Sequence, residues 1–260
     1  MLINSYRFAT ATTLWTPAQI TTALWLDAAD AGTISPSGGA VSQWSDKSGN
    51  SRHAAQGTAG KRPLFAATGL NSMPAIDCDG TDDELLLAGV TSLTSVNQSL
   101  FVVAKRDNAG GRAEISIAIG NASIGDSIAE IPRWSDNIMY TQVGYNVNRP
   151  ATTSVITDLP YISSATGGSI QRSYTNGTLV GTGTTQSTTP FSVTAGYIGS
   201  GTAVSTSNRY FDGKISEIVL LPQEASTVTR QLVEGYLAHK WGLTANLPAG
   251  HPYKSTAPTV

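Results

Sequence analysis

A cluster of acidic side chains is the first feature of this sequence that could do chemistry. Asp77, Asp79, Asp82, Asp83 and Glu84 lie in one short segment. Carboxylate oxygens at such spacing are the ligands that Ca²⁺ prefers, although the segment lacks the glutamate that closes an EF-hand loop. Asp79 and Asp82 are therefore candidate Ca²⁺ ligands. The alternative is structural, because aspartates at turns accept hydrogen bonds from nearby backbone N–H groups.

Asp27 and Asp30 form a second acidic pair near the N-terminus. Asp27 is a candidate third ligand, which would complete the Ca²⁺ site from another strand. A role in turn geometry is again the alternative for this pair.

Hydrolytic chemistry finds less support in the residue pattern. Glycoside hydrolysis needs two carboxylates that flank a cleft, but Glu114, Glu130, Glu217, Glu224 and Glu234 each lack an acidic partner at a suitable spacing. A serine hydrolase needs converging Ser, His and Asp, and no serine lies in a G-x-S-x-G motif. We therefore expect a protein that is not an enzyme.

Aromatic and basic residues occur together in the central segment EIPRWSDNIMYTQVGY. Trp134, Arg133, Tyr140 and Tyr145 are candidate ligand-binding residues, because sugar C–H faces pack on aromatic rings beside a few polar groups. The alternative is that Trp134 belongs to the core.

Composition limits the elements that can carry these residues. Charged residues are 13% of the 260, hydrophobic residues are 40%, and the net charge is −2. A chain with this weak charge lacks the basic surface of a nucleic-acid binder. Its apolar content argues against disorder, and no apolar run is long enough to cross a bilayer. We expect no basic and apolar leader of the signal-peptide type at the N-terminus.

Most of the sequence reads as strands separated by turns. SLFVVA (99–104) is apolar at consecutive positions, which indicates a strand buried on both faces. Asn176-Gly177 is the favoured pair for a two-residue turn, and it predicts a hairpin of Ile170–Tyr174 and Thr178–Val180. Trp25, Trp44 and Trp241 are predicted core residues.

One segment, 226–241, has helical periodicity. Ser226 is the expected N-cap and Gly242 the expected residue after the helix. The apolar residues that share one face of this segment are Val228, Leu232, Val233, Tyr236, Leu237 and Trp241. We predict an N-terminal arm or attachment segment over 1–16, one domain over 17–254 and a tail over 255–260.

Five segments, taken in order, resemble the concanavalin A-like lectin/glucanase superfamily in its laminin-G-like bacterial and phage branch. They are ALWLDAAD (Ala23–Asp30), WSDKSGNSRHA (Trp44–Ala54), AIDCDGTDDELLL (Ala75–Leu87), SYTNGTLVG (Ser173–Gly181) and the stretch from YFDGKISEIVLL to EGYL (Tyr210–Leu237). Ser216-Glu217 stands where the family often has an acidic pair. The E-x-D-x-x-E strand of the family's glucanases is absent from the sequence.

The resemblance implies an all-β fold, a jelly-roll sandwich of two antiparallel sheets with about a dozen strands and one C-terminal α-helix. We expect a bacteriophage virion surface protein, in a tail fibre, tail tip or head decoration. Its partners would be host surface glycans or other virion proteins, and it would form a homo-oligomer without inserting in a membrane. The alternatives are a stand-alone bacterial lectin, which would be extracellular, and a glycan-cleaving hydrolase or lyase.

Overall fold

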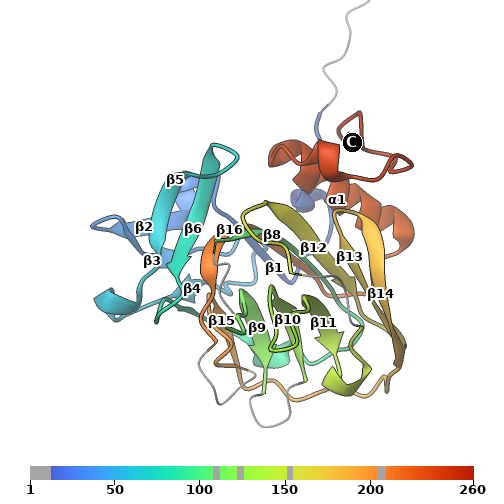
Figure 1. Ribbon diagram of the computed structural model, residues 1–260, viewed down its shortest axis with the longest axis horizontal. Helices are drawn as coiled ribbons and strands as arrows, with labels where there is room; N and C mark the ends of the chain where they lie inside the picture. The colour runs from blue at the N-terminus through green and yellow to red at the C-terminus, as the bar shows by residue number, and fades with distance from the viewer. Residues whose placement is uncertain (1–12, 108–111, 122–125, 151–154, 204–208) are drawn as a thin grey trace, which may run out of the picture.

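The computed structural model describes residues 13–107, 112–121, 126–150, 155–203 and 209–260. Strands account for most of the secondary structure in these ranges, as the sequence predicts (Figure 1). The strands are β1 (Leu24–Asp27), β2 (Ile34–Ser37), β3 (Ala40–Trp44), β4 (Ala54–Ala55), β5 (Leu64–Leu70), β6 (Met73–Asp79), β7 (Leu85–Leu87), β8 (Ser99–Arg106), β9 (Ile117–Gly120), β10 (Ser127–Ile131), β11 (Tyr140–Gly144), β12 (Tyr161–Thr166), β13 (Ile170–Thr175), β14 (Thr178–Thr185), β15 (Ala195–Ile198) and β16 (Asp212–Leu221). The helix α1 spans Thr227–Lys240. Short 3₁₀ turns lie at Pro17–Gln19, Ala31–Thr33, Ala59–Lys61, Val90–Ser92, Asn146–Asn148 and Thr244–Asn246.

The strands form one antiparallel sheet that curls into a sandwich. Hydrogen bonds connect them in the order β11-β10-β9-β15-β7-β4-β3-β5-β6-β16-β8-β12-β13-β14, with β1 on β16 and β2 on β3. The curl brings β10 and β11 against β8, and β11 against β12 and β13, so the two ends of the sheet become facing layers. The all-β fold with one C-terminal helix is confirmed, with 16 strands among the described residues in place of about a dozen.

The central strands separate two apolar cores. In β8, Leu100 and Val102 face the core inside the sandwich, while Phe101 and Val103 face the core under α1. All four are fully buried, and each contributes on the order of 2 kcal/mol of burial free energy. The apolar run in this strand is explained by its two covered faces. A third, smaller cluster lies on the outer face of β9, β10 and β11.

The helix begins and ends where its capping residues predict. Ser226 Oγ accepts a hydrogen bond from Thr229 N at 3.1 Å, and Gly242 has a φ of +68°. Leu237 and Trp241 are buried on the sheet as predicted, but Val228 is 70% exposed. The first turn of α1 therefore does not bury its apolar residue.

The predicted hairpin is β13 and β14. Asn176 and Gly177 have φ values of +49° and +77°, the left-handed region that a two-residue turn of this type needs. Asn176 also fixes the turn against β12, because its Oδ1 accepts from Ile162 N at 2.9 Å.

The predicted arm and tail meet in the structure. Leu14 and Thr259 form an antiparallel bridge, and Trp15 N donates to Pro258 O at 2.9 Å. The Trp15 ring is buried edge-on against Tyr236, with ring centroids 5.9 Å apart. Most of the predicted arm, residues 1–12, lies outside the described residues, so its role stays a prediction.

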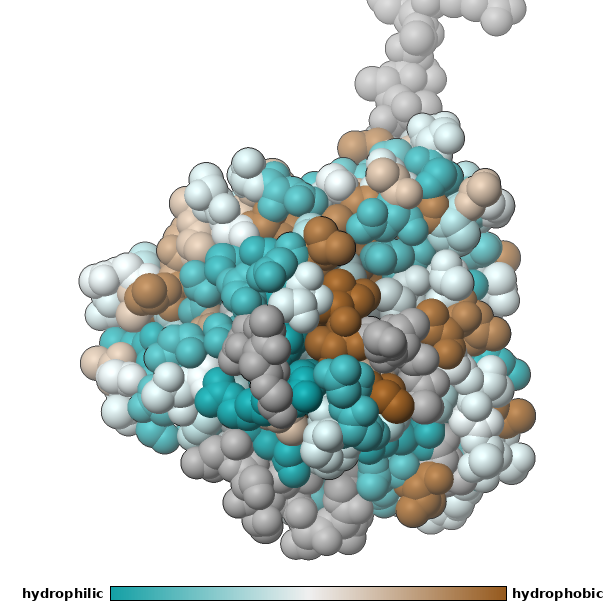
Figure 2. All heavy atoms as spheres, viewed as in Figure 1, coloured by the Kyte–Doolittle hydropathy of each residue, from teal (hydrophilic) through white to brown (hydrophobic). Residues whose placement is uncertain are grey.

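The surface is largely polar but weakly charged. Figure 2 shows a face covered mainly by hydrophilic and intermediate residues, with limited apolar patches. In the described part of the chain, no helix combines the length and hydropathy that crossing a bilayer would require.

Candidate functional site

Three of the four predicted ligand-binding residues lie at the loop between β10 and β11. Arg133 and Trp134 lie in this loop, and Tyr140 begins β11. Trp134 N donates to Ile138 O at 2.9 Å, and Asn137 N donates to Trp134 O at 3.0 Å. Asn137 has a φ of +64°, a conformation that asparagine tolerates. These backbone bonds hold the loop in one conformation and place Trp134 on it.

Two arginines from other loops join this group. The guanidinium carbon of Arg149 lies 4.0 Å from the ring centroid of Tyr140 and 5.0 Å from that of Trp134. The guanidinium carbon of Arg209 lies 4.0 Å from the Trp134 centroid. Such cation–π contacts stabilise both partners. We call Trp134, Tyr140, Arg149 and Arg209 the arginine–aromatic cluster. Arg133 lies in the same loop, but its guanidinium donates to Asn137 Oδ1 and Arg112 O instead.

In the structure, Trp134 does not form the open aromatic surface for sugar stacking that the sequence suggests. Trp134 is half-buried and packs against the apolar group on the outer face of β9, β10 and β11. Its ring is contacted by guanidinium groups, so Trp134 is neither a free stacking surface nor a fully buried core residue. The chemistry that the cluster offers is that of arginine.

Positive charge dominates the cluster. The pKa of Arg149 is lowered by burial, and the pKa of Arg209 is lowered by burial and by the charge of Arg149. Arginines stay protonated under such shifts. The nearby Asp136 carboxylate accepts from the Tyr140 hydroxyl at 2.6 Å. Because guanidinium groups bind planar anions through paired N–H donors, the cluster suits a carboxylate, sulfate or phosphate.

Tyr145 does not belong to the cluster. It follows the last residue of β11, while Tyr140 is the first, and five residues of strand span about 17 Å. The Tyr145 hydroxyl donates to Thr189 O at 3.1 Å, and its ring packs on the sandwich core. The structure therefore separates Tyr145 from the other three predicted residues.

Two predicted Ca²⁺ ligands, Asp79 and Asp82, lie with Asp83. One carboxylate oxygen from each can be chosen so that all three lie within 4.8 Å of one another. Backbone groups already bond to these oxygens, because Asp79 Oδ1 accepts from Thr81 N at 2.8 Å and Asp83 Oδ2 accepts from Asp79 N at 3.0 Å. Burial raises the pKa of Asp83 to about 6. These contacts support the turn role, and the Ca²⁺ role stays a prediction.

The third predicted ligand, Asp27, lies elsewhere. Its Oδ2 is 2.9 Å from Lys47 Nζ, and its Oδ1 is 2.6 Å from Lys240 Nζ. Two ammonium groups therefore satisfy this carboxylate, and they would oppose a cation at the same place. The combination of Asp27 with Asp79 and Asp82 is corrected by this placement.

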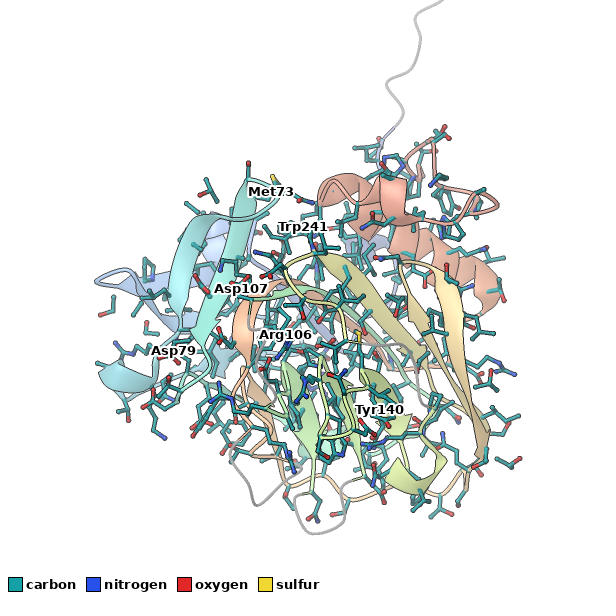
Figure 3. All side chains as sticks on the ribbon, viewed as in Figure 1. Met73, Asp79, Arg106, Asp107, Tyr140 and Trp241 are labelled. Carbon is teal, nitrogen blue, oxygen red and sulfur yellow. The ribbon has the colours of Figure 1, made fainter. Side chains whose placement is uncertain are left out.

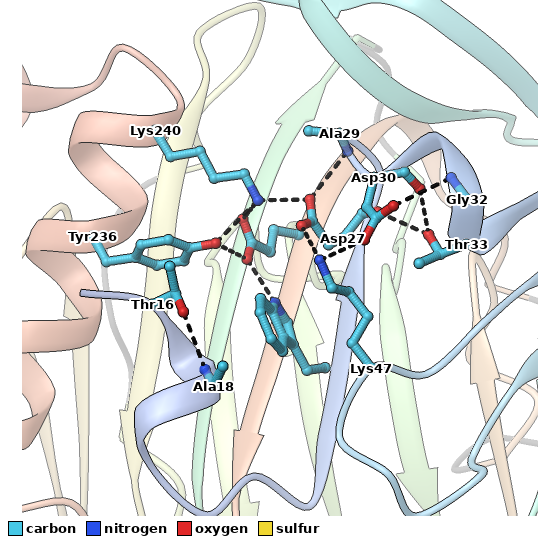
Figure 4. A network of polar contacts seen from close by, with 12 residues as sticks. Thr16, Ala18, Asp27, Ala29, Asp30, Gly32, Thr33, Lys47, Tyr236 and Lys240 are labelled. Carbon is cyan, nitrogen blue, oxygen red and sulfur yellow. Dashed lines mark hydrogen bonds and ion pairs between the residues drawn. The ribbon is translucent and has the colours of Figure 1, made fainter. Parts of the chain in front are cut away.

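Sequence reasoning missed the partner of Asp27, which is Glu217. The register pairs Asp27 with Glu217 across β1 and β16. Lys240 Nζ contacts both carboxylates: it lies 2.6 Å from Asp27 Oδ1 (Figure 4) and 2.8 Å from Glu217 Oε2. Glu217, treated as isolated in the sequence, therefore has an acidic neighbour from a strand far away along the chain. No local signal could have shown this contact, since it depends on strand register.

Glu217 is saturated with hydrogen-bond donors. Trp25 Nε1 and the Tyr236 hydroxyl bond to Oε1 at 2.8 and 2.9 Å. Trp241 Nε1 bonds to Oε2 at 2.6 Å. Burial raises the pKa of Glu217, while Lys240 opposes that shift. With these donors in place, the fully buried carboxylate joins β1, β16 and α1.

The three groups occupy separate parts of the molecule. Figure 3 shows Asp79 at the end of β6, Tyr140 among β9 to β11, and Trp241 beside α1.

Comparison with known proteins identifies relatives in fold. No protein-family model and no curated protein sequence matches this chain. A Trypanosoma rangeli sialidase with sialic acid matches with a TM-score of 0.57 and 14% identity, over 89% of this chain and 36% of that one. Domain 4 of AbnA, a GH43 extracellular arabinanase from Geobacillus stearothermophilus solved with arabinotriose, matches with a TM-score of 0.56 and 17% identity, over 71% and 89%. Botulinum neurotoxin type C, whose cell entry depends on two ganglioside molecules, matches with a TM-score of 0.55 and 10% identity, over 85% and 53%.

The likeness is one of fold, and this chain spans about a third of the sialidase. It supports the predicted β-sandwich class in coarse form. The expectation that the protein is not an enzyme is contradicted, because two of these three matches come from glycoside-cleaving enzymes. That expectation relied on local carboxylate spacing, and the Asp27–Glu217 pair shows that such spacing misses carboxylates on paired strands.

Proposed function

We propose that this chain is a glycan-binding β-sandwich domain whose arginine–aromatic cluster contacts sugars that carry a negative charge. The observation that carries the proposal is the position of Arg149, which is packed between Tyr140 and Trp134 while Arg209 covers Trp134. The aromatic rings fix the direction of the guanidinium groups. Fixed, partly desolvated donors lose little freedom when an anion binds.

The fold relatives support an acidic glycan as the ligand class. The sialidase was solved with sialic acid, a sugar that carries a carboxylate. Entry of the neurotoxin depends on gangliosides. A guanidinium pair suits such a carboxylate, and the aromatic edges around it suit the apolar face of a sugar ring.

The test is a glycan array followed by calorimetry with sialyllactose and lactose as matched probes, with Ca²⁺ and with a chelator. We expect sialyllactose to bind more tightly than lactose, and Arg149→Gln to weaken it about tenfold or more, because a charge-assisted hydrogen bond is lost. Arg62→Gln is the control, since its guanidinium bonds to the carbonyls of Gln56 and Gly57 instead.

Equal affinity for the two probes, or no effect of Arg149→Gln, would contradict the acidic-glycan site. Product analysis of the same incubations reports whether a bound glycan is also cleaved. Loss of binding in chelator would assign Ca²⁺ to the complex.

The setting that we propose is an exposed surface, on a virion or in the extracellular space. The support is compositional, because a surface rich in Ser, Thr and Gly with few charges keeps nonspecific attraction low. Detection of the protein in purified particles, against the surrounding medium, would distinguish a virion component from a free lectin.

A further inference from the structure

A second recess lies where the sheet meets the start of α1. This cavity of about 520 Å³ is lined by Thr166 and Arg172 of the sheet, by Tyr174, and by Glu224 and Arg230 beside and on α1. Its volume lies within the roughly 300–1,000 Å³ of small-molecule sites. No residue of the arginine–aromatic cluster lines it.

Arg230 lines this cavity from a buried position. It is only 6% exposed, its guanidinium carbon lies 3.9 Å from the Tyr174 ring centroid, and its Nη1 bonds to Glu234. Among the residues that the structure describes, its remaining N–H groups have no hydrogen-bond partner. A buried arginine with open donors that lines a cavity is a pre-positioned binding group.

Arg172 and Glu224 supply an exposed donor and acceptor at the rim. Their closest N and O atoms are 3.8 Å apart, and both side chains are about two-fifths exposed, so the pair is loose. Gly168 lets Glu224 approach, because a Cβ there would lie 2.2 Å from Glu224 Oε2. A ligand can therefore insert between the two groups without breaking a tight ion pair.

The charges of this cavity balance. Glu234 offsets Arg230, and Glu224 offsets Arg172. The carboxylate accepts hydrogen bonds, and the guanidinium groups beside it donate them. This combination is complementary to adjacent hydroxyl groups on an uncharged molecule. This balance differs from the excess positive charge of the arginine–aromatic cluster.

We propose that this cavity is a second binding site, independent of the arginine–aromatic cluster, for an uncharged saccharide unit. Glu224 accepts from sugar hydroxyls, Arg172 and Arg230 donate to them, and Tyr174 holds Arg230 in place.

The experiment uses the full chain and a panel of methyl glycosides of glucose, galactose, mannose, xylose and arabinose. Saturation-transfer NMR identifies binding, and titration gives the affinity. We expect at least one glycoside to bind, and both Glu224→Gln and Arg172→Gln to weaken it about tenfold, because each removes a charged hydrogen-bonding partner. Val228→Thr is the control, since Val228 is exposed on the same helical turn and does not line the cavity.

Three results would overturn this site. One is the absence of any glycoside signal at millimolar concentration. Another is unchanged affinity in both Glu224→Gln and Arg172→Gln. The last is tighter binding of glucuronic acid than of methyl glucoside, which would exclude the uncharged ligand class. Because Glu224 and Arg172 are partly exposed, both variants should fold, and circular dichroism verifies this.

Discussion

Glu217 accepts from four donors on one buried carboxylate, one from β1 and three from α1 and its C-cap. We expect Glu217→Gln to lower the free energy of unfolding by about 3 kcal/mol, because loss of one partner leaves the other charges buried and uncompensated. The new amide would also direct N–H groups at donors such as Trp241 Nε1. Chemical denaturation measures the change. The exposed control Val228→Thr should stay within about 0.5 kcal/mol, and a loss no larger in Glu217→Gln would contradict a structural role for the carboxylate.

Glu130 gives the protein a pH dependence of defined sign. It is fully buried, it accepts from Ser116 and Tyr161, and burial raises its pKa from 4.5 to about 7. Between these values the unfolded state loses the proton while the folded state keeps it. Stability therefore falls as pH rises through this window and levels off above pH 7, with a total loss of about 3 kcal/mol.

Glu130→Gln isolates this effect. Asp83, whose pKa is raised to about 6, contributes with the same sign, so the informative quantity is the stability of the wild type minus that of the variant. We expect this difference to decrease between pH 4 and pH 8 in denaturation titrations. A difference that stays constant with pH would mean that Glu130 is ionised in the folded protein.

The site residues that could be predicted are those close together in the sequence. Trp134 and Tyr140 pack in one apolar group because one short loop carries them, and Arg133 lies in the same loop. Arg149 and Arg209 come from other loops, and no periodicity indicates that they meet Trp134. Tyr145 was misplaced for the converse reason, because an extended strand separates sequence neighbours in space.

Glycines in the turn of the β13–β14 hairpin and in the 3₁₀ turn Ala59–Lys61 offer a matched pair of substitutions. Gly177 has a φ of +77°, and an added Cβ would lie 3.1 Å from a ring carbon of His251. We expect Gly177→Ala to cost about 1–2 kcal/mol, because a side chain is strained in this conformation. Gly60→Ala is the control, since nothing lies within 4 Å there, and it should be neutral or stabilising by up to about 1 kcal/mol. Equal effects in thermal melts would contradict the strained-turn explanation.

Hairpin and helix were predictable because local chemistry specifies them. Asn176-Gly177 determines a turn, and Ser226 with Gly242 delimits α1. The order of the strands depends on which apolar faces cover one another after the sheet curls. The exposed Val228 illustrates the limit, since its spacing is helical but its side chain is 70% exposed, whereas Arg230 of the same turn packs on Tyr174 of the sheet.

The two ends of the described chain pair with each other. Val260 N donates to Thr13 O at 3.0 Å, next to the Leu14–Thr259 bridge. Trp15, held by this pairing, packs on Tyr236, which donates to Glu217. A continuous set of contacts therefore links the last residues to the network under α1. The sequence predicts that 255–260 is a tail, and this linkage allows that prediction to be tested.

Deletion of residues 255–260 tests this prediction. It removes the carbonyl that accepts from Trp15 N and uncovers a ring that is 5% exposed. We expect the free energy of unfolding to fall by about 1–3 kcal/mol, the range for two backbone hydrogen bonds, and the Trp15 amide to exchange faster in hydrogen-exchange mass spectrometry. Val260→Ser, at a residue 67% exposed, is the control and should change neither. Unchanged exchange at Trp15 in the deletion variant would show that 255–260 is a tail. Faster exchange would show that 255–260 closes the domain. In that case the paired ends hold α1 on the sheet through Tyr236 and Glu217.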